Sequence, residues 1–121
     1  MLNNVQIYLK GDNMNIRDKL YKRDNKTILK SINIDDSLYE KIRNATEKIY
    51  DAKLSDVINV AMEEYIERNK PTYYAKPKAE SVTYRNLMLR KSNIKKFNEY
   101  HQKTGISFTR LVNGAIKEFF E

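Results

Sequence analysis

Residues 27–35 have the sequence TILKSINID, and residues 82–90 repeat its pattern in degenerate form as VTYRNLMLR. Successive side chains of an extended strand point to opposite faces, so Ile32 and Ile34 share one face of the first segment. The second segment carries leucine at both matching positions. An isolated two-stranded ribbon is marginal in water and needs helices packed on its apolar face. The two segments therefore predict paired strands that are covered by helices on one side.

The other face of each predicted strand carries side chains that are free to contact another molecule. A solvent-exposed sheet face is the alternative interpretation, but the repetition of the pattern and the basic balance of the chain favour a binding surface. These outward residues are Leu29, Ser31 and Asn33 in the first segment and Tyr84, Asn86 and Met88 in the second.

Two helical patterns follow the first strand. Apolar residues recur at helical spacing over roughly 36–50, and a wider apolar stripe runs through 55–68. Polar side chains at the start of each pattern can accept hydrogen bonds from the free amides of the first turn. The expected capping residues are Asp35, Asp36 and Ser37 for the first helix and Ser55 for the second.

The second strand is also followed by two helical patterns. Ser92 is the expected cap of a helix that runs to Thr104. Gly105 closes this helix, because glycine adopts the left-handed conformation of a helix end most readily. Ser107 is the expected cap of the last helix, whose apolar stripe continues to Phe120.

The helical segments repeat as the strands do. The sequences VINVAMEEYIE at 57–67 and LVNGAIKEFFE at 111–121 share Asn, Ala and two Glu at matching positions, with apolar residues throughout the stripe. This match indicates an internal repeat, and 121 residues suffice for two small modules that share a core. The expected organisation is a basic leader (1–26), a first repeat (27–68), a linker (69–81) and a second repeat (82–121).

The segments outside the repeats carry weaker signals. Both prolines of the chain lie in the linker, which is expected to be extended because proline lacks an amide donor and restricts the residue before it. Tyr73 and Tyr74 of the linker can stack on bases or cover the core, and we favour the core. The leader has six basic and three acidic residues, which suits an arm along phosphates, but a solvated leader is the favoured interpretation.

Composition limits the classes of function. The chain has 23 Lys and Arg against 16 Asp and Glu, a net charge of +7 that favours a polyanionic partner such as nucleic acid or an anionic membrane surface. It contains no cysteine and one histidine, so thiolate and His-cluster metal sites are excluded. No apolar run is long enough to span a membrane, and there is no signal-peptide pattern. We expect a soluble cytoplasmic protein without cofactor, small-molecule substrate or enzymatic activity.

A short strand, a capped helix, a turn of the G-I-S-x-[ST] type and a helix with a central alanine resemble the ribbon-helix-helix family of DNA-binding regulators, the MetJ, Arc and CopG group. The turn is GISFT at 105–109, and the alanines are Ala61 and Ala115. The resemblance covers 27–68 and 82–121. The two-copy form resembles tandem regulators of this family from archaeal filamentous viruses, which implies the host cytoplasm as the compartment if the protein is viral.

The resemblance implies a mainly α-helical fold with a short two-stranded antiparallel β-ribbon, made by two ribbon-helix-helix modules that share a core in one chain. In this family the ribbon enters the major groove, which is about 12 Å wide, and the second helix of each module holds phosphate at its N-terminus. The resemblance assigns base reading to the six outward residues named above. It assigns phosphate binding to Lys53, Leu54 and Ser55 and to Ser107, Phe108 and Thr109.

Several residues depart from the family pattern. Leu29, Tyr84 and Met88 replace the polar or basic residues usual on the reading face, and they suit contacts with thymine methyl groups. The two halves of the ribbon are therefore expected to read different sequences. Lys30 and Arg85 are expected on the inward face near the ribbon ends, from which their long side chains can extend to phosphate.

The leading hypothesis is a sequence-specific transcription regulator, either repressor or activator, that binds double-stranded DNA. A homodimer or higher assembly would place ribbons in successive major grooves about 34 Å apart. The alternative is an antitoxin-type interaction protein that also binds its own operator. Antitoxins of this kind usually carry a partner-wrapping tail after the last helix, and nothing follows Glu121 in the sequence, so the regulator is favoured.

Overall fold

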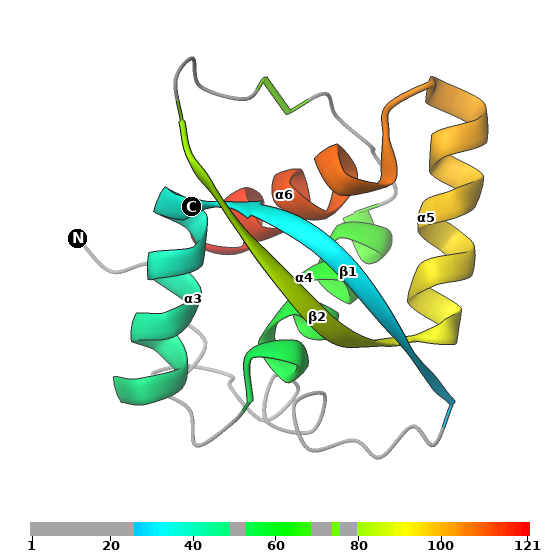
Figure 1. Ribbon diagram of the computed structural model, residues 1–121. Coiled ribbons are helices and arrows are strands. Elements are labelled where there is room, and N and C mark those ends of the chain that lie inside the picture. Colours follow the sequence, from blue (N-terminus) through cyan, green and yellow to red (C-terminus); the bar gives the residue numbers. More distant parts are fainter. Residues whose placement is uncertain (1–25, 49–52, 69–73, 76–79) are drawn as a thin grey trace.

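The computed structural model describes residues 26–48, 53–68, 74–75 and 80–121 (Figure 1). The predictions for residues 1–25 of the leader and for Tyr73 lie outside the described residues. The described elements are β1 (Thr27–Asp35), α3 (Asp36–Lys48), α4 (Leu54–Arg68), β2 (Val82–Arg90), α5 (Lys91–Thr104) and α6 (Phe108–Phe119). The prediction of a mainly helical fold with a two-stranded antiparallel sheet is confirmed.

The two strands pair antiparallel over their full length, with Thr27 opposite Arg90 and Asp35 opposite Val82. The alternation of their side chains follows the sequence pattern. The inward residues are at most 1% exposed, and they are Ile32, Ile34, Leu87 and Leu89. This alternation explains why the strand boundaries could be predicted, because a shift of one residue would turn the apolar side chains to the other face.

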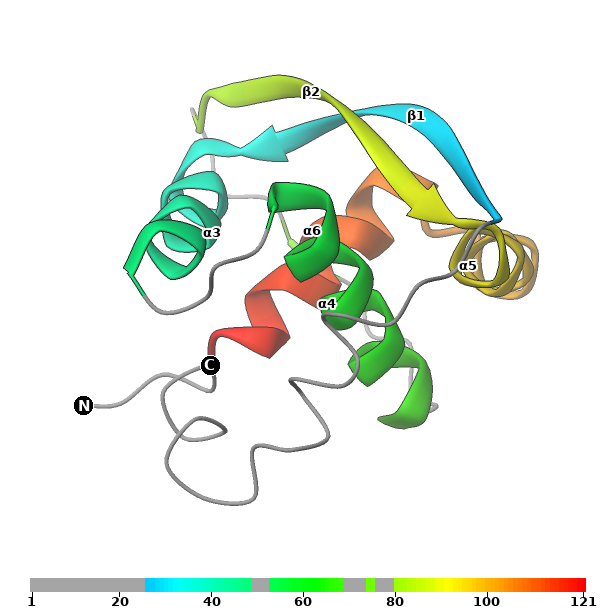
Figure 2. The same cartoon turned by 90° about the horizontal axis from the view of Figure 1, so that it is seen from below.

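The helices lie on one side of the ribbon (Figure 2). α4 and α6 pass beneath it, while α3 and α5 lie at its two ends. One hydrophobic core joins the inward side chains of both strands to the apolar faces of all four helices. On the α5 side, Tyr65 from the first repeat packs against Phe97 and Tyr100 from the second, with ring centroids 5.5 and 6.1 Å apart.

The first helix of each repeat begins directly after its strand, and the residue that precedes the paired strand supplies a carbonyl to the first amide of the helix. The Asp36 amide donates to the Ser81 carbonyl at 3.0 Å, and the Lys91 amide donates to the Lys26 carbonyl at 2.9 Å. The expectation that Ser92 caps α5 is wrong, because the cap position is Arg90, two residues earlier, and Arg90 makes no side-chain capping bond.

The first two residues of α3 also have partners other than those expected. The Asp36 carboxylate accepts hydrogen bonds from the Ser81 and Thr83 hydroxyls, which hold its pKa below the usual range. The Ser37 amide in the first turn donates to the Glu80 carboxylate at 2.8 Å. The residues that precede β2 therefore satisfy the start of α3.

The turn between α5 and α6 agrees with the prediction. Gly105 has φ of 77°, a left-handed conformation, and its amide donates to the His101 carbonyl. Ser107 caps α6, since its hydroxyl accepts a hydrogen bond from the Arg110 amide at 3.2 Å. The turn therefore ends α5 at Thr104 and starts α6 at Phe108.

Candidate nucleic-acid interface

The outer face of the ribbon carries all six residues predicted to contact bases, and all six are exposed. The register pairs them across the two strands as Leu29 with Met88, Ser31 with Asn86 and Asn33 with Tyr84. Every exposed large apolar side chain among the described residues lies on these two strands. Among these apolar side chains, Leu29 and Tyr84 have the largest exposed fractions, 60% and 64%. A cluster of this kind marks a contact surface.

Ser31 and Asn86 form the centre of this face. Each is the fifth residue of its nine-residue strand, and the two are paired, so the strand pairing is symmetric about them. The Ser31 hydroxyl donates to the Asn86 side-chain oxygen at 2.5 Å. This bond uses the oxygen of the Asn86 amide and leaves its nitrogen as the donor that can face a ligand.

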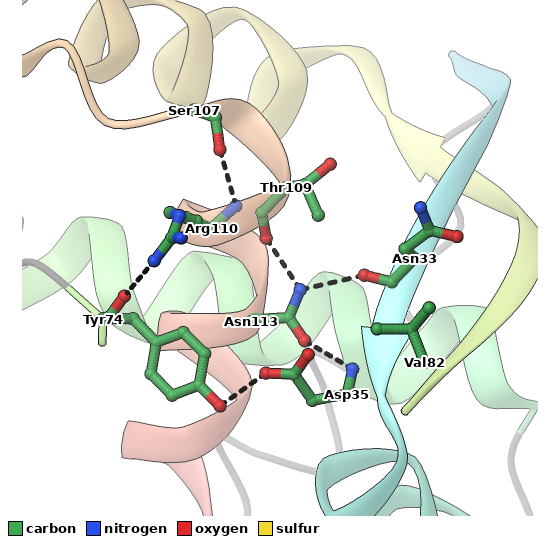
Figure 3. Close-up of a pocket in the computed structure, with 8 residues that line it drawn as sticks. All are labelled: Asn33, Asp35, Tyr74, Val82, Ser107, Thr109, Arg110 and Asn113. Carbon is green, nitrogen blue, oxygen red and sulfur yellow. Dashed lines mark hydrogen bonds between the residues drawn. The ribbon is translucent and has the colours of Figure 1, made fainter. Parts of the chain in front are cut away.

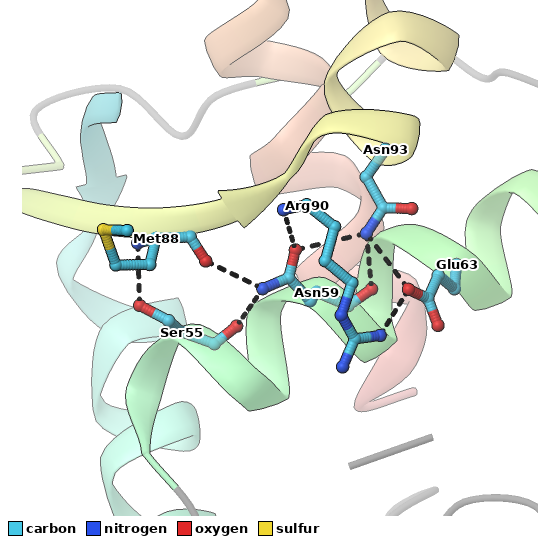
Figure 4. Close-up of polar contacts among 6 residues, drawn as sticks. All are labelled: Ser55, Asn59, Glu63, Met88, Arg90 and Asn93. Carbon is cyan, nitrogen blue, oxygen red and sulfur yellow. Dashed lines mark hydrogen bonds and ion pairs between the residues drawn. The ribbon is translucent and has the colours of Figure 1, made fainter. Parts of the chain in front are cut away.

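Two buried asparagines attach α4 and α6 to the edges of the ribbon (Figures 3 and 4). Asn113 accepts a hydrogen bond from the Asp35 amide at 2.9 Å and donates to the Asn33 carbonyl at 3.0 Å. Asn59 makes the equivalent pair of bonds with the backbone of β2, at 2.9 and 3.0 Å. Each asparagine thus binds the strand of the other repeat and satisfies edge groups that a two-stranded sheet leaves open.

The start of α6 and the facing edge of the ribbon line a cleft (Figure 3). The cleft has a volume of about 220 Å³, and its lining includes Asn33 and Val82 from the ribbon and Thr109 and Arg110 from α6. The Arg110 guanidinium donates to the Tyr74 carbonyl at 3.1 Å. The outward-facing residue Asn33 and the cationic side chain at the start of α6 therefore line the same cleft.

The N-terminus of α4 differs from that of α6 in charge and in bonding, and Figure 4 shows the contact of its Ser55 with Met88. The Lys53 amide donates to the Asp56 carboxylate at 3.2 Å, and Asp56 takes the place that Arg110 has in the second repeat. The expectation that Ser55 caps this helix is wrong, because its hydroxyl accepts a hydrogen bond from the Met88 amide at 3.1 Å. A carboxylate suits a helix N-terminus but repels phosphate. The two helix starts are therefore unequal as phosphate sites.

Lys30 and Arg85 are not near the ribbon ends, as the sequence suggested, but beside the central pair. The Lys30 ammonium lies 4.5 Å from the centre of the Phe108 ring, at the start of α6. The Arg85 guanidinium lies over the Tyr39 ring at 5.0 Å and donates to its hydroxyl. The structure thus brings Lys30, but not Arg85, to one of the two helix N-termini predicted to hold phosphate.

The other predicted phosphate residues contribute in different ways. Leu54 and Phe108 are partly buried against the core, so their backbone is the part that can contact a ligand. Thr109 is half-buried and lines the cleft. Lys53 is exposed just before α4, and Ser107 is exposed just before α6. The eight predicted residues therefore fall into two groups around the helix starts, with Arg85 apart.

Sequence reasoning missed Arg110 and gave no role to Asn59 and Asn113. A basic residue three positions after the capping Ser107 was a usable signal, since it lies in the first turn of the helix. The asparagines occupy matching positions inside two apolar stripes, where a buried polar side chain needs hydrogen-bond partners. That need could have predicted their contact with backbone, but not with which strand.

Tyr74 is a linker residue that covers the core, as favoured from the sequence. Its hydroxyl donates to the Asp35 carboxylate at 2.6 Å. Burial, with this hydrogen bond, raises the pKa of the Tyr74 hydroxyl. The ring lies against α6, where a Cβ on Gly114 would come 3.2 Å from the Tyr74 Cβ. Tyr74 is thus held beside the cleft.

His101 lies on the surface of α5, where its Nδ1 is 2.8 Å from the Ile106 carbonyl. Within the described ranges no group of three or more His, Cys, Asp or Glu side chains could hold a metal ion. No helix in the described part of the chain has the length and apolar character needed to cross a membrane. Comparisons of this chain with protein-family models, curated proteins and solved structures find no match.

Proposed function

We propose that this protein is a sequence-specific double-stranded DNA-binding regulator of transcription, in which two ribbon-helix-helix modules share one core and insert their common ribbon into the major groove. The observation that carries the proposal is the outer face of the ribbon. Six exposed side chains stand on it, and no described element covers them. A two-stranded ribbon fits the major groove, where such side chains meet base edges.

The surroundings of the ribbon support the same function. The starts of α4 and α6 lie beside different strands of the ribbon, because Ser55 of α4 contacts Met88 of β2 and Phe108 of α6 contacts Lys30 of β1. Free amides at helix starts favour phosphate, and the cation of Arg110 adds to this at α6. Rigid attachment through Asn59 and Asn113 fixes the distance between base-facing and phosphate-facing groups.

Selection of binding sites from random duplex DNA, followed by titration of the selected site at several salt concentrations, tests the proposal. We expect one enriched sequence and an affinity that falls with salt, with a slope of about 0.9 per phosphate contact in log–log form. A scrambled duplex of the same length is the control and should bind more weakly. Absence of an enriched sequence, or a flat response to salt, would contradict the proposal.

A protein-binding ribbon is the second candidate, and the apolar character of the outer face favours it. Leu29, Tyr84 and Met88 together form an exposed surface that a protein partner, such as the toxin of an antitoxin-type pair, could bury. The same salt titration separates the two functions. An interface of these side chains alone would respond weakly to salt, and substituting Arg110 would leave it unchanged.

A further inference from the structure

We propose that the ribbon binds DNA in one fixed direction, with its Asn33–Tyr84 end over an adenine-containing segment and its Leu29–Met88 end over thymine methyl groups. The inference rests on the proposed function and adds the polarity and base composition of the target. It follows from a difference between the two ends of a ribbon whose backbone pairing is symmetric. The strand pairing is symmetric about Ser31 and Asn86, yet the side chains on either side of this pair are chemically different.

The two ends offer different groups to base edges. The Asn33 amide carries a donor and an acceptor side by side, the combination that matches the N6 and N7 edge of adenine. Tyr84, opposite Asn33, adds a hydroxyl and is 64% exposed. Leu29 and Met88 at the other end are apolar, and the apolar group available in the major groove is the thymine methyl.

The phosphate-facing groups differ in the same way along the ribbon. Asn33 lines the cleft that holds Arg110, so the amide end of the ribbon lies beside a cationic helix start. Met88 is bonded to Ser55, so the apolar end lies beside the helix start that carries Asp56. At these helix starts phosphate is attracted more strongly at the amide end.

The first helices of the repeats also differ. Lys91 and Lys95 in α5 are exposed near the apolar end of the ribbon, and their equivalents in α3 are Asp36 and Glu40. Positive charge is thus supplied by α6 at one end and by α5 at the other. Turning the protein by 180° on the same DNA would exchange both the base contacts and the phosphate contacts. A segment under one ribbon therefore has no dyad symmetry.

Directed cleavage of DNA measures this direction. The chain contains no cysteine, so Ser37→Cys and Ser92→Cys each provide a single attachment point for an iron chelate. These serines are exposed equivalents on α3 and α5, at opposite ends of the ribbon, and belong to neither set of contact residues. Each labelled full-length chain is bound to the selected site, trimmed to a duplex that binds one chain by native mass spectrometry. The parent chain, treated with the same reagent, is the control.

We expect the chelate at position 37 to cleave at the adenine-containing end and the chelate at position 92 to cleave only at the thymine-containing end. Cleavage at both ends by each label would overturn the fixed direction while leaving specific DNA binding intact. Cleavage spread evenly along the duplex would instead overturn the proposed function, and the polarity with it. The two failures therefore leave different patterns on the same gel.

Base analogues test the chemical assignment. Replacing thymine by uracil removes only the methyl group and should weaken binding about fourfold per contact at the Leu29–Met88 end. Replacing adenine by 7-deazaadenine removes the N7 acceptor and should weaken binding by about fivefold or more at the other end. The uracil effect should vanish in Met88→Ala with Leu29→Ala, and the 7-deazaadenine effect in Asn33→Ala. If uracil, or 7-deazaadenine, weakened binding equally when placed at either end of the site, the assignment would be contradicted.

Discussion

The two repeats of this chain build matching halves of one ribbon but carry opposite charge. The first repeat has six basic and nine acidic residues, a net charge of −3, whereas the second has eight basic and three acidic residues, a net charge of +5. Part of the difference lies at equivalent positions around the ribbon. At three such positions an acidic residue of the first repeat corresponds to a basic residue of the second. The pairs are Asp35 and Arg90, Asp56 and Arg110, and Glu63 and Lys117.

One of these differences joins the repeats to each other (Figure 4). Arg90 of the second repeat is 4% exposed and makes an ion pair with Glu63 of the first at 2.5 Å. Two first repeats paired in the same geometry would place Asp35 at the position of Arg90, beside another Glu63. Two second repeats would place Arg90 beside Lys117. Like charges in partly buried positions are costly, so the charges favour pairing of unlike repeats.

The largest expected effect concerns the part in which the repeats agree. Ile32→Ala and Leu87→Ala remove equivalent core side chains, both 1% exposed, and should each lower the free energy of unfolding by about 2–5 kcal/mol. Urea unfolding measures this loss. The outward substitution Ser31→Ala is the control and should change stability by about 0.5 kcal/mol or less. If only one of the two substitutions lowered the free energy of unfolding, the two halves would not share one core.

The next effect concerns the charged pair. Glu63→Ala leaves Arg90 buried without this partner and should cost about 3 kcal/mol, the low end for a broken buried pair because the Glu63 side chain is 20% exposed. Lys117→Ala is the matched change in the second repeat. Lys117 is 47% exposed and pairs with Glu121 on the surface, so about 0–1 kcal/mol is expected. Equal losses in urea unfolding would argue against a pairing preference.

The hydrogen bond between Tyr74 and Asp35 makes the stability of the protein depend on pH. Tyr74→Phe removes a hydrogen bond from the buried Asp35 carboxylate and should cost about 1–3 kcal/mol. The folded protein raises the pKa of Tyr74 above its unfolded value of 10.0, so this stabilisation is complete below pH 10.0 and is lost as the pH rises above it. Tyr100 shares the trend through burial. Between neutral pH and pH values above 10.0, Tyr74→Phe should therefore lose less stability than the parent. The same alkaline loss in both would exclude this role.

The smallest expected effect is a difference in DNA binding between a substitution at the start of α6 and one at the start of α4. Arg110→Ala should weaken binding to all duplexes and reduce the salt slope by about 0.9, because one phosphate contact is lost. Asp56→Ala at the equivalent position removes a negative charge and should not weaken binding. Fluorescence titration at several salt concentrations gives both slopes. A larger loss with Asp56→Ala than with Arg110→Ala would reverse the assignment of the stronger phosphate site.

Both strands and the inward set of side chains were predictable, because a period of two ties each residue to one face. Helix starts were less predictable where the partner lies far along the chain. Lys91 needs no side-chain cap since Lys26 supplies a carbonyl, and Ser55 bonds Met88 on the strand of the other repeat. Such contacts exist only once the repeats are paired, so local capping rules pointed to the wrong serines.

The candidate site was also predictable only in part. The six outward residues follow from alternation alone, and the structure brings all six onto one face. Arg110 could be placed at a helix start from its distance to Ser107, but its cleft also depends on Tyr74, which comes from the linker. The position of Lys30 and Arg85 depended on the register, and pairing of Ser31 with Asn86 moves both to the centre.

Binding of the selected duplex by Asn33→Ala and Asn86→Ala, compared with the parent at one salt concentration, tests the central claim most directly. Each substitution removes an amide from the outer face without changing the charge. We predict a loss of about 1–3 kcal/mol on the selected site, nearly unchanged binding to a scrambled duplex and an unchanged melting temperature. If both variants bind the selected site as tightly as the parent, the outer face of the ribbon does not read DNA.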